Sequence, residues 1–264
     1  MKKISFRVIA IIAVVLLGFT CMQAQKNVML DNYFNNEINK KTNQPFHYLW
    51  EDLSYGGFSE LGSIFTENGA KLSSLKEKPD CKNLKNADVY IIVDPDHLAD
   101  NEKPNYMDKK AAAAIAKWVK KGGVLLMLTN YSTNCELEKF NLLSTKFGIQ
   151  YVKDLNHPEL RGADKKIRNF PSCASVNLPA HKVFEGVSKI FIKEISSIIC
   201  KAPAKAVLVE GGKVFMAEAA YGKGYVFAVG DPWLYNEYID HALLPVDFEN
   251  KKAAQNLVKL LLSK

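Results

Sequence analysis

The sequence predicts an open, doubly wound α/β fold in which a mostly parallel sheet is followed by a strand-rich C-terminal half. Up to residue 152, short apolar runs alternate with amphipathic segments of helical period, the pattern of a parallel sheet covered on both faces. Beyond residue 180, closely spaced apolar runs are separated by glycine-rich turns, which indicates hairpins. The 264 residues, 48% of them apolar and 24% charged, suit one domain over residues 25–264.

The parallel half is predicted from apolar strands and the helices between them. We expect strands at 27–31, 71–75, 88–93, 124–129 and 149–152, and helices at 58–68, 106–121 and 135–147. Phe58, Leu61 and Phe65, for example, repeat at helical spacing before Gly69, a natural C-cap. Because the spacers are long enough for right-handed crossovers, the first four strands should lie parallel in one sheet, with the first two helices on its faces.

The C-terminal half is predicted from closely spaced strands that follow a polar, irregular stretch at 153–180. We expect strands at 190–195, 206–210, 214–219 and 225–229. The glycines at 211–212 and 222–224 supply hairpin-like turns between them. An amphipathic helix is expected at 248–262. The sequence contains no internal repeat and no low-complexity linker, so all of these elements are assigned to one domain.

Residues 1–24 are predicted to be a secretory signal peptide. Three basic residues flank the start of the apolar run at 8–18, which is too short to span a bilayer but suits a secretory h-region. Cleavage is expected after Ala24. The alternative is a lipoprotein signal with Cys21 as the lipidated residue, but Thr20 is bulkier than the residue expected before such a cysteine. No other segment approaches the roughly 20 apolar residues of a membrane span, so we expect a periplasmic or secreted protein without one.

The charge balance argues against a nucleic-acid partner. The net charge is +7, and residues 1–24 carry three of these positive charges, so the rest of the chain has +4. Four charges spread over the mature chain are no nucleic-acid signature. The lysines of the predicted helix at 106–121, such as Lys110, Lys117 and Lys121, are expected to form a solvated helix face.

The cysteine pattern predicts neither a disulfide scaffold nor a zinc site. The cysteines after the signal peptide are Cys81, Cys135, Cys173 and Cys200. None of them has a CxxC partner or a histidine at zinc spacing. Buried free thiols are favoured, and pairing of Cys173 with Cys200 stays open. The P-loop and GxGxxG patterns are both absent, so no cofactor is expected.

Six segments carry a resemblance to a known family. They are DNYFNNE (31–37), HYLWEDLSYGGFSELG (47–62), ADVYIIVDPD (87–96), KWVKKGGVLLML (117–128), HKVFEGV (181–187) and YGKGYVFAVGDPWLYNEY (221–238). With these segments the chain resembles class I glutamine amidotransferase-like domains, whose fold is flavodoxin-like. Among them it resembles the secreted type found alone or fused to unsaturated rhamnogalacturonyl hydrolases in polysaccharide-degrading bacteria. The resemblance implies a role in polysaccharide utilisation.

The residues of amidotransferase chemistry are missing from this pattern. An amidotransferase places a cysteine on a sharp strand-to-helix turn, but here the predicted strand at 124–128 runs into the sequence TNY at 129–131. Cys135 comes later and lacks flanking glycines. The family's histidine stands two residues before a glutamate, whereas His241 is followed by alanine and leucine. We therefore expect no cysteine-dependent glutamine hydrolysis, and whether the protein is an enzyme stays open.

Polar side chains follow four of the predicted strands. They are Asp31, Asn32, Asn35 and Asn36 after the first strand, Asp94 and Asp96 after the third, Asn130, Asn134 and Glu136 after the fourth, and Asp231, Trp233, Tyr235, Asn236 and Glu237 after the strand at 225–229. Ligands of open α/β sheets bind beyond the carboxyl ends of the strands. Amides and carboxylates suit sugar hydroxyls, so we expect a carbohydrate site with Trp233 as its stacking floor, and Asp231, Asn236 and Glu237 sharing one pocket with Asp31, Asn32 and Asp94. The alternative is that these residues form turns and N-caps.

Other polar groups give weaker hypotheses. His47, Glu51 and Asp52 suit a metal or acid/base group, and His97 with Asp94 and Asp96 suits a metal site, but loop polarity and helix capping are favoured, so no metal is predicted. For glycoside hydrolysis, the carboxylate pair would be Asp94 or Asp96 with Asp231 or Glu237.

Three functions remain open from the sequence. The leading one is a secreted, catalytically altered amidotransferase-like domain that binds carbohydrate or a partner in polysaccharide utilisation. The second is a hydrolase acting on small acidic or plant-derived sugars. The third is a structural or protein-interaction module. The oligomeric state cannot be derived from the sequence.

Overall fold

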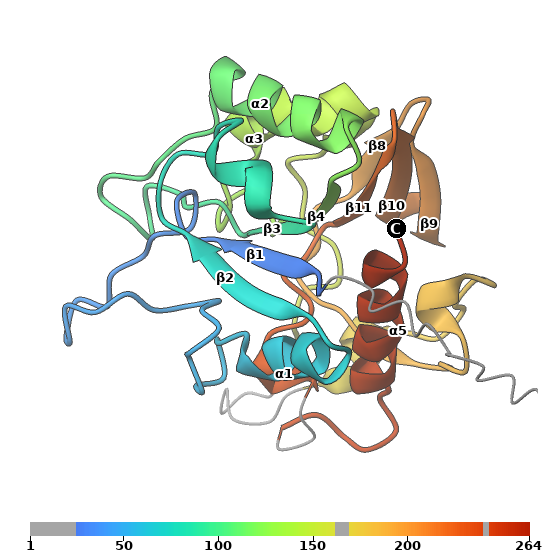
Figure 1. The fold of residues 1–264 in the computed structure, drawn as a ribbon. Helices are drawn as coiled ribbons and strands as arrows, with labels where there is room; N and C mark the ends of the chain where they lie inside the picture. The colour runs from blue at the N-terminus through green and yellow to red at the C-terminus, as the bar shows by residue number, and fades with distance from the viewer. Residues whose placement is uncertain (1–24, 162–168, 240–242) are drawn as a thin grey trace, which may run out of the picture.

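Figure 1 shows the computed structural model, which describes residues 25–161, 169–239 and 243–264. Within these residues the main sheet has nine strands, in the order β2-β1-β3-β4-β11-β10-β8-β5, with β9 paired to β10. The strands are β1 (Asn27–Asp31), β2 (Lys71–Leu75), β3 (Val89–Val93), β4 (Val124–Leu128), β5 (Ile149–Tyr151), β8 (Ile198–Cys200), β9 (Lys205–Glu210), β10 (Lys213–Tyr221) and β11 (Gly224–Val229). The helices are α1 (Ser59–Glu67), α2 (Lys109–Lys120), α3 (Leu137–Ser144), α4 (Asn236–Ile239) and α5 (Asn250–Leu262). A separate antiparallel pair joins β6 (Ala174–Ser175) to β7 (Ile190–Phe191).

The predicted parallel arrangement is confirmed. β1 pairs in parallel with β2 and β3, and β3 pairs in parallel with β4. Every residue of β3 and β4 is buried, as expected for strands covered on both faces. β11 then lies parallel to β4 and antiparallel to β10, so this strand joins the parallel half to the antiparallel half.

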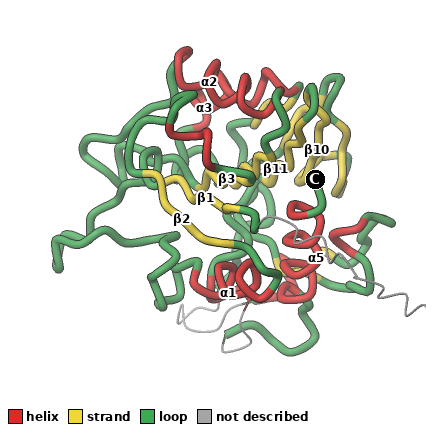
Figure 2. Tube along the Cα trace, viewed as in Figure 1, coloured by secondary structure: helices red, strands yellow, loops and turns green. Residues whose placement is uncertain are grey.

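Helices cover both faces of the sheet, as Figure 2 shows. Val89, Ile91 and Val93 belong to the core that α1 and α5 cover. Tyr90 and Ile92 belong to the core under α2 and α3. This alternation follows from the two-residue side-chain period of a strand, which sends successive side chains to opposite faces.

The predicted helices are present but shorter. α2 begins at Lys109 instead of residue 106, because the Asp108 side chain accepts a hydrogen bond from the Ala111 N–H at 2.8 Å and caps the helix. The predicted helix at 135–147 is α3 followed by a 3₁₀ turn, η2 (Thr145–Phe147), which ends at Gly148 with a φ of +78°. The C-terminal helix starts at Asn250 instead of residue 248.

The antiparallel half differs more from the sequence-based expectation. The strand expected at 190–195 is present only as β7, and Glu194, with a φ of +52°, lies outside it. β6 and β8 were not predicted, because runs of two or three residues carry no periodicity. The strand expected at 149–152 exists as β5, but it lies at the far edge, antiparallel to β8.

Several expectations concern residues outside those described. The signal peptide at 1–24, lipidation of Cys21 and the histidine at 241 all fall there. In the described part of the chain no helix is long and apolar enough to cross a membrane. Cys81, Cys135, Cys173 and Cys200 are free thiols, so the pairing of Cys173 with Cys200 that the sequence left open is not formed.

Candidate functional site

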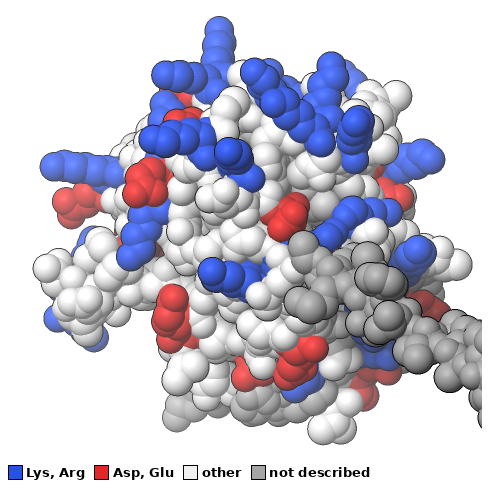
Figure 3. All heavy atoms as spheres, viewed as in Figure 1, with Lys and Arg blue, Asp and Glu red and all other residues white. Residues whose placement is uncertain are grey.

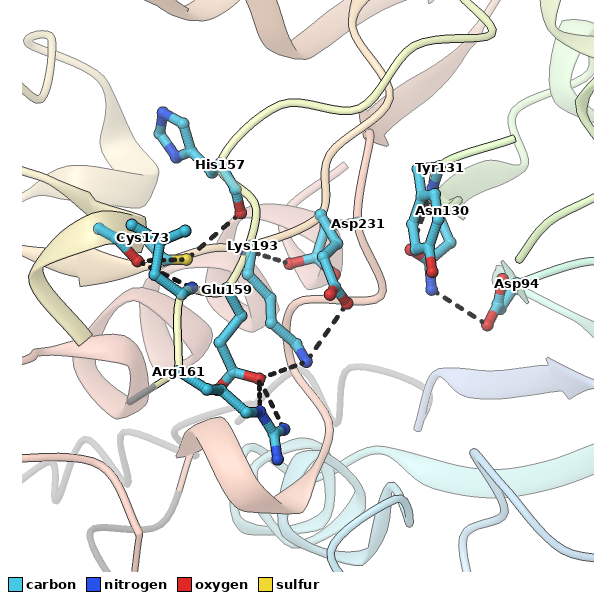
Figure 4. A network of polar contacts seen from close by, with 12 residues as sticks. Asp94, Asn130, Tyr131, His157, Glu159, Arg161, Cys173, Lys193 and Asp231 are labelled. Atoms are coloured by element: carbon cyan, nitrogen blue, oxygen red, sulfur yellow. Dashed lines mark hydrogen bonds and ion pairs between the residues drawn. The ribbon is translucent and has the colours of Figure 1, made fainter. Parts of the chain in front are cut away.

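Asp94, the residue directly after β3, has a buried and incompletely paired carboxyl group. Its N–H donates to the Leu128 carbonyl at 2.8 Å, and its φ of +41° then turns the chain out of the sheet. Oδ2 accepts hydrogen bonds from Tyr48 Oη at 2.8 Å and Asn130 Nδ2 at 3.4 Å, the latter drawn in Figure 4. Oδ1 has no hydrogen-bond partner among the described residues, although Asp94 is only 5% exposed.

The environment of Asp94 favours its neutral form. Burial raises the pKa of this carboxyl group well above its usual range; the Tyr48 hydrogen bond opposes the rise, and the charge of Glu37 adds to it. A neutral carboxyl group holds one proton. Because Oδ2 already accepts from Tyr48 and Asn130, the proton belongs on Oδ1, which then presents an O–H donor.

Two loops pack against each other beside Asp94. Asn35 Nδ2 donates to the Asp94 carbonyl at 2.9 Å, and Asp96 Oδ2 accepts from the Asn36 N–H at 3.0 Å and from Asn101 Nδ2 at 2.7 Å. Asn35 Oδ1 and Asp96 Oδ1 are buried, and neither finds a hydrogen-bond partner in the part of the chain that the structure describes. Burial raises the pKa of Asp96 to about 6. We call the side chains of Asn35, Asp94 and Asp96 the Asp94 cluster.

Aromatic rings border this cluster. Tyr48, which contacts Asp94 directly, has its ring centroid 5.8 Å from that of Tyr235 and 5.4 Å from that of Phe58. His47 and Tyr48 both have positive φ, +65° and +50°, a conformation that is uncommon for residues other than glycine and concentrates at functional sites. The loop that carries these residues is therefore held in an unusual shape over the end of β3.

A second group of buried charges surrounds Asp231, which follows β11 and Gly230. Asp231 is 2% exposed, and its Oδ2 accepts a hydrogen bond from the Lys193 N–H at 3.3 Å. Lys193 Nζ lies 3.7 Å from Glu159 Oε2 and 3.3 Å from Glu194 Oε2. Figure 4 shows Asp231, Lys193 and Glu159 directed toward one another. Burial raises the pKa of Asp231 to about 7, although the charge of Lys193 opposes this rise.

The two groups lie along one edge of the sheet. Val93 pairs with Leu128, and Leu128 pairs with Val229, so Asp94 and Asp231 follow strands that are two positions apart. Strands are spaced about 4.8 Å apart, which puts the two backbones about 10 Å apart. Tyr235 lies between the groups: its ring contacts Tyr48, and the charge of Asp231 adds to the burial that raises its pKa.

Three predicted site residues make turn and cap hydrogen bonds within the fold. Asp31 Oδ1 accepts from the N–H groups of Tyr33 at 3.2 Å and Phe34 at 2.7 Å, and its Oδ2 accepts from the Tyr90 hydroxyl. Asn32 Nδ2 donates to the Asp31 carbonyl at 3.1 Å. Glu136 caps α3 by accepting from the Lys139 N–H at 2.8 Å. These side chains therefore stabilise turns and a helix N-terminus, which is the alternative interpretation of the sequence.

The expectation for the loop after β11 needs correction. Trp233 is completely buried, so it does not form a stacking floor for a ligand. Asn236 Oδ1 accepts from the Glu60 N–H at 3.0 Å, while its Nδ2 lies within 3.1 Å of the carbonyls at 52 and 54 and of Ser59 Oγ. The Glu237 N–H donates to the Tyr55 carbonyl at 3.0 Å. This loop therefore fastens the segment before α1 to the core.

The weaker groups named from the sequence are not assembled as expected. His47 Nδ1 lies 3.3 Å from Glu37 Oε1, whereas Glu51 is exposed and Asp52 Oδ1 accepts from the Ser54 N–H at 2.8 Å. His97 Nδ1 accepts from the Ala99 N–H at 3.3 Å. Within residues 25–161, 169–239 and 243–264, no three His, Cys, Asp or Glu side chains are arranged to hold a metal ion.

The surroundings of Cys135 do not suit a nucleophilic thiol. Its side chain is completely buried. Burial raises the pKa of this thiol well above its usual range. Reactive cysteines have the opposite property, because the thiolate is the nucleophile and their surroundings lower the pKa.

Sequence reasoning missed three residues of these groups. Tyr48 belongs to one of the segments that resemble the family, but no spacing rule connects it to Asp94, which lies 46 residues later. Glu159 falls in the stretch that the sequence assigned as polar and irregular. Lys193 was placed inside a strand. A charged residue next to the apolar run at 190–192 was the available signal for it.

Comparisons with known proteins support the fold. No known protein-family model and no curated protein matches the sequence. Among solved structures, the "mmIFT52 N-terminal domain" is similar with a TM-score of 0.67 and 14% identity, over 90% of this chain and 98% of that one. "Cytoplasmic Protein STM1381 from Salmonella typhimurium LT2" is similar with a TM-score of 0.58 and 16% identity, over 90% of this chain and 99% of that one.

A GMP synthase-like protein from Thermoplasma acidophilum is also similar, with a TM-score of 0.49 and 10% identity, over 91% of this chain and 96% of that one. At that score the likeness carries no argument about membership of the amidotransferase family. The stronger likenesses show the fold alone. Together with the strand order, they confirm the predicted class, an open α/β sheet of the flavodoxin-like kind.

Proposed function

We propose that the protein is a carbohydrate-binding domain whose ligand is held by the Asp94 cluster. The observation that carries this proposal is the set of three buried oxygens, on Asn35, Asp94 and Asp96, that find no hydrogen-bond partner among the described residues. A buried polar atom without a partner costs about 1–3 kcal/mol, so such groups call for a ligand or a bound water.

The chemistry of the three oxygens suits neighbouring hydroxyl groups. The neutral Asp94 offers a donor at Oδ1, while Asn35 and Asp96 offer acceptors. A sugar hydroxyl both donates and accepts, so adjacent hydroxyls of one ring can satisfy all three atoms. Tyr235, whose ring contacts that of Tyr48, supplies aromatic surface at the border of the cluster.

Binding includes a movement of the loop that carries Tyr48. Asn35, Asp94 and Asp96 are at most 5% exposed, so a ligand cannot reach them in the conformation described here. Tyr48 closes over Asp94 from the irregular segment that precedes α1. Displacement of this segment opens a path to the cluster. It costs the Tyr48 hydrogen bond, the burial of the Tyr48 ring and the Asn236 contacts that fasten the segment to the core.

The resemblance to secreted polysaccharide-utilisation proteins, with the basic and apolar segment at 1–24, extends the proposal to the compartment. We place the protein in the periplasm or outside the cell, with its mature N-terminus at Gln25. Mass spectrometry of the protein produced in its native host tests this. A chain that begins at Met1 would contradict secretion, and a lipid on Cys21 would correct the type of signal.

A panel of neutral and acidic oligosaccharides, titrated calorimetrically, tests the carbohydrate site. Asp94→Ala and Asp96→Ala should each weaken binding at least about tenfold, because each removes an atom that pairs with the ligand. Asp31→Ala is the matched control: it is also a buried aspartate at a strand end, but its oxygens are paired within the protein. If all three variants lose the same affinity for the oligosaccharide, the losses reflect impaired folding and not a binding site. Absence of binding to every sugar would favour the interaction-module hypothesis.

A hydrolase is the second candidate, favoured by Asp231. A carboxyl group with a pKa of about 7 is half-protonated near neutrality and suits a general acid. Asp94 would be its partner, although the backbone separation of about 10 Å is long for the carboxyl spacing of roughly 5 to 9.5 Å in glycosidases. Product formation from the same oligosaccharides, abolished by Asp231→Asn, would establish this function over simple binding.

A further inference from the structure

A groove lined by lysines runs along the end of the sheet opposite to the Asp94 cluster. Three adjoining hollows of about 380, 560 and 500 Å³ form it. Lys117 lines all three, Cys81 lines the first two, and Lys121 lines the first and third, so the hollows are continuous. Asp88 and Gly123, which precede β3 and β4, also line the first hollow. We call this feature the lysine groove.

The lysine groove holds more positive charge than the mature chain as a whole. Its lining includes eight lysines and two aspartates, a net charge of +6, whereas residues 25–264 together carry +4. The lysines come from three places: the segment at 78–85, α2 with the turn that follows it, and the turn between β10 and β11. Figure 3 shows Lys and Arg side chains gathered over the end of the molecule that carries α2.

Few of the lysines that line the groove form ion pairs with other described residues. Among the described residues, Lys78 is the one lining lysine with an ion pair, to Asp108. The two lining aspartates are engaged by backbone groups: Asp80 Oδ1 accepts from the N–H of residue 82 at 2.7 Å, and Asp88 Oδ2 accepts from the Asn27 N–H at 2.8 Å. Lysines in the last turn of α2 also suit the helix dipole, but this does not explain those outside the helix, such as Lys85 and Lys223.

The backbone under the groove is firmly connected. The Lys223 N–H donates to the Lys120 carbonyl at 3.0 Å, which fastens the β10–β11 turn to the end of α2. A side chain on Gly222 would meet that same carbonyl oxygen at 2.5 Å, so the close approach requires glycine. Trp118 Nε1 donates to the Ala87 carbonyl at 3.2 Å. The lysines are thus presented from a fixed frame, which lowers the entropic cost of binding a ligand.

We propose that the lysine groove binds an anionic polysaccharide, with the lysine ammonium groups pairing with carboxylates or sulfates along the chain. Among the described residues, the lining contains no arginine, the side chain that forms bidentate hydrogen bonds with phosphate. Its one aromatic side chain, Trp118, is partly buried and hydrogen-bonded, so the described lining offers no series of rings on which successive bases could stack. A polysaccharide needs only point charges along a concave path, and lysine supplies them.

The test measures the affinity of the purified mature protein for three probes: polygalacturonate for carboxylates, heparin for sulfates, and single-stranded DNA for phosphates. A triple variant, K85Q/K117Q/K121Q, removes three lining charges. The matched control, K71Q/K251Q/K259Q, removes three exposed lysines elsewhere. The groove variant should lose about tenfold in affinity for a polysaccharide, and the control should lose less than about twofold. Whichever polysaccharide binds more tightly identifies the anionic group, carboxylate or sulfate.

Cys81 gives an independent readout, because its thiol is exposed and lines the groove. Bound polysaccharide should slow alkylation of Cys81 in the wild type and not in the groove variant. Three outcomes would overturn the proposal: equal losses in the groove and control variants, tighter binding of DNA than of either polysaccharide, or alkylation of Cys81 that no polysaccharide changes. Because neutral sugars and the Asp94 variants are absent from this test, it stands apart from that of the carbohydrate site.

Discussion

Replacement of Asp231 by asparagine should make the protein more stable at alkaline pH and flatten the pH dependence of its stability. Burial raises the pKa of Asp231 from 3.8 to about 7, so the folded state binds more protons than the unfolded state between these values. The contribution of Asp231 to the free energy of unfolding is therefore most favourable below pH 3.8, and it becomes less favourable as the pH rises to about 7. At about 1.4 kcal/mol per unit, ionised Asp231 lowers the free energy of unfolding by about 4 kcal/mol.

Urea unfolding at pH 5 and pH 8 measures this effect. The free energy of unfolding of Asp231→Asn, relative to that of the wild type, should rise by about 3 kcal/mol from pH 5 to pH 8. The reason is that Asp231 in the folded wild type loses its proton within that interval. Asp154→Asn is the control. Hydrogen bonds from Ser197 and Lys213 outweigh burial and lower the pKa of Asp154, so its variant should be less stable by the same amount at both pH values. If the difference in free energy of unfolding between Asp231→Asn and the wild type is the same at both pH values, the reasoning is refuted.

Three further predictions follow from burial and hydrogen bonding. Trp233→Ala should lower the free energy of unfolding by about 3–5 kcal/mol, measured by urea denaturation, because the side chain is completely buried. Asn236→Ala should lower it by about 3 kcal/mol, since at least three hydrogen bonds are lost; a loss under 1 kcal/mol would contradict its fastening role. In the native protein, iodoacetamide should modify exposed Cys81 and leave buried Cys135 intact by mass spectrometry, and any catalytic activity should survive Cys135→Ser.

The parallel half of the fold could be predicted because its signals are long and local. β3 and β4 are uninterrupted apolar runs, and α2 has both a helical period and a glycine after its end. The antiparallel half was harder because β6, β7 and β8 have two or three residues each, which is too few for a period to appear. Their positions are set by partners distant in the sequence, such as β5 for β8.

The candidate site could be predicted only as a location. The edge of the sheet could be named from the sequence, because strand ends are visible there and polar residues follow them. Which of those residues are free for a ligand depends on contacts across the fold. Asp31 and Asp94 look alike in the sequence, yet Tyr90 and two N–H groups satisfy the first while Oδ1 of the second stays unpaired among the described residues.

A crystal structure of the protein with its tightest-binding oligosaccharide tests the proposed carbohydrate site most directly. We predict that sugar hydroxyls lie within about 3.2 Å of at least two of three atoms, Asn35 Oδ1, Asp94 Oδ1 and Asp96 Oδ1. Tyr48 should have moved away from Asp94 to admit the ring. A sugar bound elsewhere, with ordered water on all three oxygens and the Tyr48 hydrogen bond intact, would contradict the proposal.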